Sequence, residues 1–146
     1  MAASGPATPA GYSGTPLHRK LGITPGARVL AAGVPPGWDL TVLDPDGTAS
    51  VTTSARHPPY DVVVAFCPDL ATLESSLPTR IGQVTEKGRL WVCWPKRASG
   101  VRSDLDDNVV RGRGLAAGVV DVKVCAVDAT WSALCFMTRL RDRTGP

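Results

Sequence analysis

Two uninterrupted apolar runs with a helical pattern between them constrain the fold of this chain most. The runs are Tyr60–Phe66 and Arg89–Trp94. Continuous apolar runs of this length are typical of strands covered on both faces of a parallel sheet. Between them, aliphatic residues recur at spacings of three and four from Leu70 to Val84, interrupted by Pro78, and Lys87-Gly88 then predicts a turn. Strand, helix and strand form a right-handed βαβ unit, so the sequence predicts an α/β fold.

Shorter elements are expected before this unit. Thr15 is a candidate cap for a short helix at 16–21 that ends at Gly22. The other expected elements are a strand at Ala27–Gly33, at most a short helix at Asp39–Leu43, a turn at 44–47 and a short strand at 49–53.

A second helix and two strands are expected after the unit. Ser103, followed three residues later by Asp106, predicts a helix start. Leu105, Val109 and Ala116 suit its inner face, and Gly118 ends it. The segment 119–127 then alternates, with Val120, Val122, Val124 and Ala126 on one side, as in a half-exposed edge strand. Because 131–137 is apolar almost throughout, this strand is expected to insert between earlier elements and form a hairpin with 119–127.

The length of 146 residues suits a single domain. Residues 1–14 consist of Ala, Gly, Ser, Pro and Thr with single Met and Tyr residues, and are expected to be a flexible arm. The α/β domain is expected to span 15–140, with a C-terminal tail at 141–146.

The net charge and the hydropathy of the chain limit the classes of partner that it can bind. The net charge of +3 and the absence of an 18-residue apolar run disfavour a general nucleic-acid binder and a membrane protein. A weaker alternative is nucleic-acid binding through Arg139, Arg141 and Arg143. The first residues lack a basic region and an apolar stretch, so no secretory signal is expected. We therefore expect a cytoplasmic location.

The four cysteines, at 67, 93, 125 and 135, lack the ligand spacing of a zinc site, and no metal site is expected. Each lies in an apolar run, which favours burial as a small hydrophobic residue. The alternative is a redox pair of Cys67 and Cys93 at the ends of neighbouring strands. His18 and His57 have no nucleophile or carboxylate partner at a meaningful spacing, so no catalytic residue is predicted.

The segment Thr24–Gly33 resembles the first strand and opening turn of methyltransferases that use S-adenosylmethionine. Asp61–Phe66, Gly88–Trp94 and the terminal hairpin are similar to the second half of that fold, whose last strand inserts antiparallel. The resemblance implies a shortened, mostly parallel Rossmann-like sheet with a C-terminal antiparallel hairpin. In that family a glycine-rich first turn approaches the cofactor, and an acidic residue after the second strand binds the ribose. Here Pro35 and Pro36 stand in that turn and Ser54-Ala55-Arg56 follow the second strand, which implies an incomplete cofactor site.

The chain is also similar to a family of small bacterial proteins of unknown function. The matching phrases are Gly11–Leu17, Leu90–Lys96, Ser99–Val101 and Val120–Ser132. This resemblance brings no catalytic residues and no cofactor with it.

Ligands in open α/β sheets bind beyond the carboxyl ends of the parallel strands. Lys96, Ser99 and Gly100 would supply an ammonium, a hydroxyl and a bare amide to an anion, although a solvated loop with a conformational glycine is the preferred explanation. Trp94 and Trp131 would wall a pocket for a planar ligand, although Trp131 also suits the core and Asp128 suits a turn. The candidate ligand-binding residues are Gly33, Gly37, Trp38, Trp94, Lys96, Ser99, Gly100, Asp128 and Trp131.

Two functions are compatible with these features. The first is a non-catalytic binding or interaction module that has lost methyl-transfer chemistry and binds an unknown small molecule or protein. The second is an enzyme or sensor that binds a small anionic or nucleotide-like ligand around Lys96 and Ser99.

Overall fold

Six strands form one sheet in the order β2-β1-β3-β4-β6-β5, with β2, β1, β3 and β4 parallel. The computed structural model describes residues 14–143, so all but the last residue of the expected arm, and the end of the expected tail, lie outside the described residues. β6 lies antiparallel between β4 and β5, as its apolar sequence predicts. The predicted fold class is therefore confirmed. The strands are β1 (Arg28–Ala32), β2 (Ser50–Thr52), β3 (Tyr60–Phe66), β4 (Val84–Pro95), β5 (Val119–Ala126) and β6 (Trp131–Thr138).

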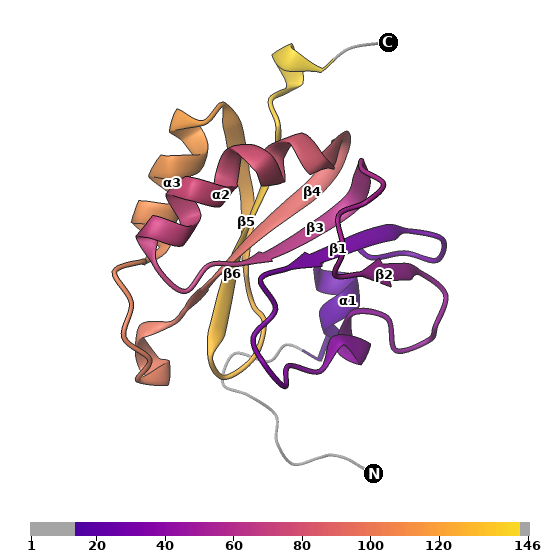
Figure 1. The fold of residues 1–146 in the computed structure, drawn as a ribbon, viewed down its shortest axis with the longest axis horizontal. Helices are drawn as coiled ribbons and strands as arrows, with labels where there is room; N and C mark the ends of the chain where they lie inside the picture. The colour runs from indigo at the N-terminus through magenta and orange to yellow at the C-terminus, as the bar shows by residue number, and fades with distance from the viewer. Residues whose placement is uncertain (1–13, 144–146) are drawn as a thin grey trace.

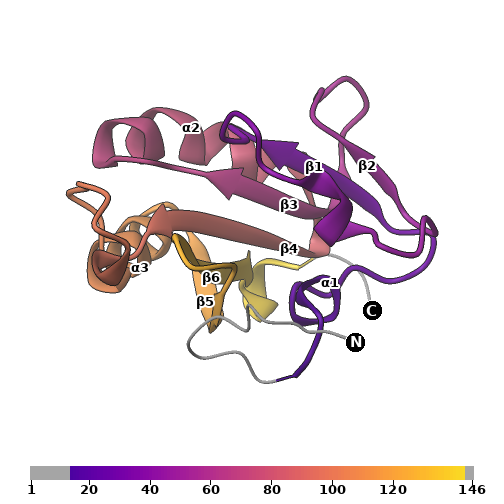
Figure 2. The same cartoon turned by 90° about the horizontal axis from the view of Figure 1, so that it is seen from below.

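Helices cover the two faces of the sheet unequally. The longer helices, α2 and α3, lie in front of the strands in Figure 1, and α1 lies behind β1. Figure 2 shows the same two layers from below. We call these sides the α2 face and the α1 face. The helices are α1 (Leu17–Lys20), α2 (Leu70–Gln83) and α3 (Asp107–Ala116), with short 3-10 turns η1 (Leu40–Leu43), η2 (Arg97–Ser99) and η3 (Leu140–Asp142). None of the helices between residues 14 and 143 has the length and apolar character needed to cross a membrane.

Each face has its own apolar core. On the α2 face, Leu73 and Leu77 of α2 belong to a buried cluster with Leu90 of β4. On the α1 face, Trp91 is fully buried, and its indole N–H donates to the carbonyl of Leu21 at 2.9 Å. Neighbouring residues of a strand point to opposite faces, which explains why a few aliphatic strands serve both cores.

Two helices begin later than the sequence predicts. Pro16, not Thr15, is the residue before α1, and no side chain caps this helix. Asp106, not Ser103, caps α3, because its carboxylate accepts the amide of Val109 at 2.8 Å. The Ser103 hydroxyl instead donates to the carbonyl of Pro68 at 2.8 Å and ties the loop to the end of β3.

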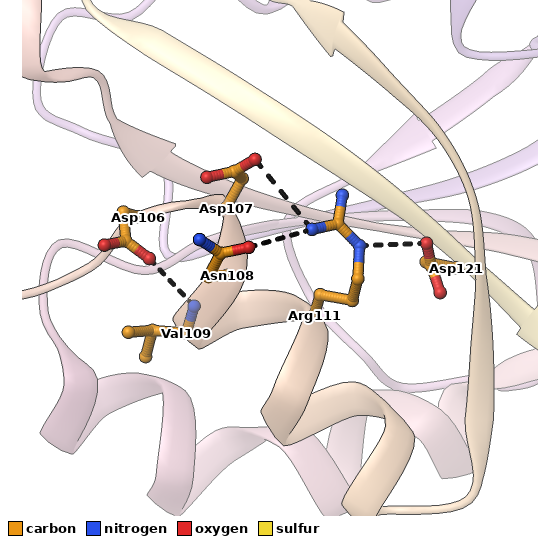
Figure 3. A network of polar contacts seen from close by, with 6 residues as sticks. All are labelled: Asp106, Asp107, Asn108, Val109, Arg111 and Asp121. Carbon is orange, nitrogen blue, oxygen red and sulfur yellow. Dashed lines mark hydrogen bonds and ion pairs between the residues drawn. The ribbon is translucent and has the colours of Figure 1, made fainter.

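The later start changes the inner face of α3. Val110 and Gly114 are its buried residues, whereas Ala116, predicted to face inward, is exposed. Arg111 joins the helix to β5, since its Nε lies 3.0 Å from the Asp121 carboxylate, and Figure 3 shows its guanidinium also turned toward Asp107 and Asn108.

Pro78 and Gly88 of the βαβ unit do not have the effects that the sequence predicts. Pro78 does not interrupt α2, which runs from Leu70 to Gln83. Pro78 and Glu74, whose carbonyl it leaves without a helical partner, are both exposed, so water can solvate that carbonyl. Gly88 lies inside β4 and not in a turn. A Cβ there would lie 2.6 Å from the Asp61 carbonyl, so glycine permits a close approach to β3.

β5 is the edge strand that its alternation predicts, but the alternation is broken. The register with β6 shifts between Asp121 and Lys123. Val122 and Val124 are 53% and 52% exposed, so these valines do not line the core. Such an irregularity disfavours edge-to-edge pairing of strands.

Candidate functional site

The carboxyl edge of the sheet gathers three connections. β1, β3 and β4 are parallel and end at Ala32, Phe66 and Pro95. The β5–β6 turn reaches the same edge, because Pro95 pairs with Trp131 and the Lys96 amide donates to the carbonyl of Thr130 at 2.8 Å. Most sequence-predicted site residues therefore lie along one edge, on both faces.

The loop after β1 folds tightly against β3. Gly33 has φ +67°, and a Cβ there would lie 2.7 Å from the Phe66 carbonyl. Gly37, with φ +76°, has open space around it. No α-helix follows this loop; instead the Asp39 carboxylate caps the 3-10 turn η1. This connection therefore lacks the glycine-rich turn and helix N-terminus on which dinucleotide phosphates rest.

Three aromatic side chains fill the α1-face side of the edge, and we call Trp38, Phe66 and Trp131 the edge aromatic cluster. The ring centroids of Trp38 and Phe66 lie 5.0 Å apart, and those of Phe66 and Trp131 lie 5.1 Å apart, both edge-to-face. Phe66 is 3% exposed and Trp131 is 8% exposed. The cluster is thus a packed part of the core.

Asp128 holds this cluster together. One carboxylate oxygen accepts the amides of Thr130 and Trp131, each at 2.8 Å. The other accepts the indole N–H of Trp38 at 3.0 Å. Asp128 therefore shapes the hairpin turn and attaches the loop after β1 to it.

The cavity beside the edge aromatic cluster has a volume of about 300 Å³, far more than a single water molecule needs. Its walls include Leu17, Trp38 and Val127, with the carboxylates of Asp39 and Asp128. Hydrogen bonds from the hydroxyl and amide of Thr41 lower the pKa of Asp39, which keeps this carboxylate charged. The cavity therefore suits a small apolar ligand, neutral or cationic, better than an anion.

The predicted anion loop uses its polar groups internally. The Ser99 hydroxyl donates to the carbonyl of Lys96 at 2.6 Å and accepts the amide of Val101 at 3.1 Å. Gly100 ends η2 in the left-handed conformation, with φ +80°. These three predicted residues line none of the cavities described here, and their contacts are those of a turn.

Trp94 and Trp131 do not share a pocket. Trp94 packs in the core of the α2 face and is 5% exposed, whereas Trp131 packs in the core of the α1 face. Pro95, and not Trp94, is the direct partner of Trp131 across the strands, so the two indoles point to opposite faces. The pocket that we expected between them does not form.

The cysteines show the same separation. Cys67 belongs to the core of the α2 face and Cys93 to that of the α1 face, so their thiols do not face each other. All four cysteines are free, and burial raises the pKa of each thiol. A redox pair of Cys67 and Cys93 has no geometric support. Within the described part of the chain, no three His, Cys, Asp or Glu side chains gather as a metal site.

Sequence reasoning missed Phe66 and Asp39 as parts of this edge. Phe66 is the last residue of β3, and strand ends at the carboxyl edge are a usable signal. Asp39 directly precedes η1, which is typical of a cap. Leu17, Val42 and Val127 come from three distant segments and carry no such signal.

Comparison with known proteins identifies the fold. No protein-family model matches the chain, and no curated protein matches it. A TehB-like S-adenosylmethionine-dependent methyltransferase from Corynebacterium glutamicum matches with a TM-score of 0.55 and 12% identity, over 89% of this chain and 91% of that one. A ribosomal protein L11 methylase from Lactobacillus delbrueckii subsp. bulgaricus matches with a TM-score of 0.52 and 8% identity, over 84% and 75%. A Methanococcus jannaschii fibrillarin, a pre-rRNA processing protein, matches with a TM-score of 0.51 and 9% identity, over 85% of this chain and 69% of that one. At these identities the likeness shows the fold alone, a methyltransferase-like Rossmann fold.

Proposed function

We propose that this chain is a non-catalytic binding or interaction module that keeps a methyltransferase-like fold and has lost methyl transfer. The edge aromatic cluster carries the proposal, because Trp38, Phe66 and Trp131 occupy the strand edge where cofactors of open α/β sheets bind. The three rings pack edge-to-face on one another there.

The missing acidic residue supports the same proposal. After β2 the chain continues Thr53-Ser54-Ala55-Arg56, with no carboxylate for a ribose diol. The two aspartates that line the cavity at this edge, Asp39 and Asp128, already accept hydrogen bonds from Thr41, Trp38 and the hairpin turn. A ribose would have to displace these bonds.

A direct binding measurement tests the proposal. Equilibrium dialysis of the full chain with radiolabelled S-adenosylmethionine is expected to show no saturable binding, and incubation with cell extract is expected to transfer no label. A methyltransferase that binds the cofactor serves as the positive control. Stoichiometric binding, or label transferred to any acceptor, would refute the proposal.

The second candidate, an enzyme or sensor for a small anionic or nucleotide-like ligand around Lys96 and Ser99, draws on the place of these residues after β4, at the carboxyl edge of the sheet. It is the weaker candidate, because the Ser99 hydroxyl already bonds within the turn and the cavity at this edge is lined by Asp39 and Asp128. A thermal-shift ligand screen on the wild type and on Lys96→Ala separates the two. A hit that depends on Lys96 would favour the second candidate, and hits unaffected by the substitution would remove its support.

The proposal includes a cytoplasmic location and kinship with the small bacterial family of unknown function. The phrases Leu90–Lys96 and Val120–Ser132 support the kinship. They cover the second half of β4, most of β5, the turn that follows it and the first two residues of β6.

A further inference from the structure

A second cavity, of about 320 Å³, lies beside the edge strand β2, apart from the carboxyl-edge cavity. It exists because the connection from β2 to β3, residues 53–59, contains no helix. Such parallel connections usually carry a helix that covers the sheet. β1 and β3 contribute Arg28 and Tyr60 to its lining, β2 contributes its three residues, and the connection contributes Ser54, Arg56 and His57.

Arg28 is held in place at this cavity without using its full donor capacity. Its guanidinium donates to the carbonyls of His57 and Pro59 and lies 4.8 Å from the centre of the Tyr60 ring. A guanidinium has five N–H groups, so about three remain for another acceptor. Because the side chain is already ordered, a ligand would pay little conformational entropy to engage it.

The connection is also ordered around Tyr60. The Tyr60 hydroxyl donates to the carbonyl of Ser54 at 3.3 Å and accepts the amide of His57 at 3.2 Å. The Thr52 hydroxyl accepts the amide of Ser54 at 3.0 Å. The wall of the cavity is thus built before any ligand arrives.

The charge of the lining is of one sign. Arg28 and Arg56 are its charged lining residues, and no aspartate or glutamate is among the lining residues. Outside the lining, the Asp61 carboxylate accepts the backbone amide of Arg28 at 2.8 Å. Neither arginine side chain forms an ion pair with a residue between 14 and 143. Ser50 and Ser54 are also among the lining residues, and their hydroxyls are neutral donors. By contrast, the carboxyl-edge cavity has two carboxylates.

We propose that this cavity binds a phosphate-class oxyanion, with Arg28 and Arg56 as the charged donors and the serine hydroxyls as neutral ones. Guanidinium groups match tetrahedral oxyanions through paired, charge-assisted hydrogen bonds. The oxyanion is either free phosphate or the phosphate of a small monoester, and the cavity has room for more than the phosphate alone. The site goes beyond the proposed function, since it lies away from the edge aromatic cluster.

An NMR titration of the full chain tests the site. Inorganic phosphate, adenosine monophosphate and adenosine are added separately at constant ionic strength while amide shifts are followed. Saturable shifts are expected at Ser54, Arg56 and His57 with the two phosphate compounds and not with adenosine. Arg56→Ala is expected to weaken binding about tenfold or more, the scale of one charge-assisted hydrogen bond. The matched control Arg97→Ala removes another exposed arginine, at η2, and is expected to change affinity less than about twofold, as for a distant surface charge.

The outcomes separate the alternatives. Binding of both phosphate compounds supports the site with free phosphate as a sufficient ligand, and binding of the monophosphate alone supports it with a monoester as the ligand. Equal loss in the two arginine variants would show nonspecific charge attraction and overturn the proposal. No binding, equal binding of adenosine, or shifts centred on Trp38 and Asp128 would overturn it as well. None of these results depends on whether S-adenosylmethionine binds.

Discussion

At the scale of single residues, burial decides what the thiols can do. Burial raises the pKa of Cys135 to about 11 and that of Cys93 well above its ordinary value. Each side chain is 1% exposed or less. The neutral thiol is therefore the form that fits the folded core, and neither residue is an activated nucleophile.

This burial predicts a loss of stability in alkali. Between pH 9 and about 11 the unfolded chain releases the Cys135 proton while the folded chain keeps it. The unfolded state then binds fewer protons, so the free energy of unfolding falls as pH rises, by up to about 1.4 kcal/mol per pH unit for this thiol. Urea unfolding under reducing conditions at pH 8, 9, 10 and 11 measures the slope.

Cys135→Ala is the control for that slope. It is expected to lower stability at every pH because it leaves a small cavity, yet to make the decline above pH 9 shallower. Parallel curves for the wild type and the variant would mean that Cys135 ionises as readily in the folded chain as in the unfolded one.

At the scale of elements, two glycines of α3 look alike in sequence and differ in structure. A Cβ at Gly114 would lie 2.1 Å from a ring carbon of Phe136 in β6, whereas a Cβ at Gly112 would meet nothing within 4 Å. Both glycines weaken the helix as an isolated segment. Only Gly114 is needed, because it lets α3 approach the sheet.

Replacing each of these two glycines by alanine is expected to change the free energy of unfolding in opposite directions. Gly114→Ala is expected to lower the free energy of unfolding by about 1–3 kcal/mol through overpacking. Gly112→Ala is expected to raise it by about 0.5–1 kcal/mol, since only the helix propensity changes. Chemical unfolding of the two variants measures both values, and a stabilised Gly114→Ala would contradict the packing of α3 on β6.

At the scale of the whole molecule, one contact joins segments 90 residues apart. The Trp38 indole donates to Asp128 and thereby links the loop after β1 to the terminal hairpin. The sheet order places these segments together, because β6 inserts next to β4. The edge aromatic cluster is thus a product of topology.

A double-mutant cycle measures this link. Asp128→Ala is expected to cost about 2–3 kcal/mol, since three N–H groups lose their acceptor, and Trp38→Phe about 1 kcal/mol. Because the two residues share one hydrogen bond, the double variant is expected to cost about 0.5–1.5 kcal/mol less than the sum. Additive effects in urea unfolding would show that the two side chains do not interact.

The sequence by itself determined the α/β class, the residue range of β3, the edge position of β5 and the insertion of β6 between β4 and β5. Each of these follows from whether apolar residues are continuous or alternate, a local pattern that burial on one or two faces imposes. The methyltransferase-like resemblance also agreed with the fold, and the 3-10 turn η1 lies where at most a short helix was expected.

Only the tertiary structure decided which of these residues meet. Trp94 and Trp131 lie close in the sheet but point to opposite faces, because alternate residues of a strand face opposite sides. Cys67 and Cys93 are separated between the two faces in the same way. The role of Gly114, the bond from Ser103 to Pro68 and the arginine-lined cavity depend on contacts with distant segments. A one-residue change in strand register reverses the face of a side chain, and no local pattern carries that information.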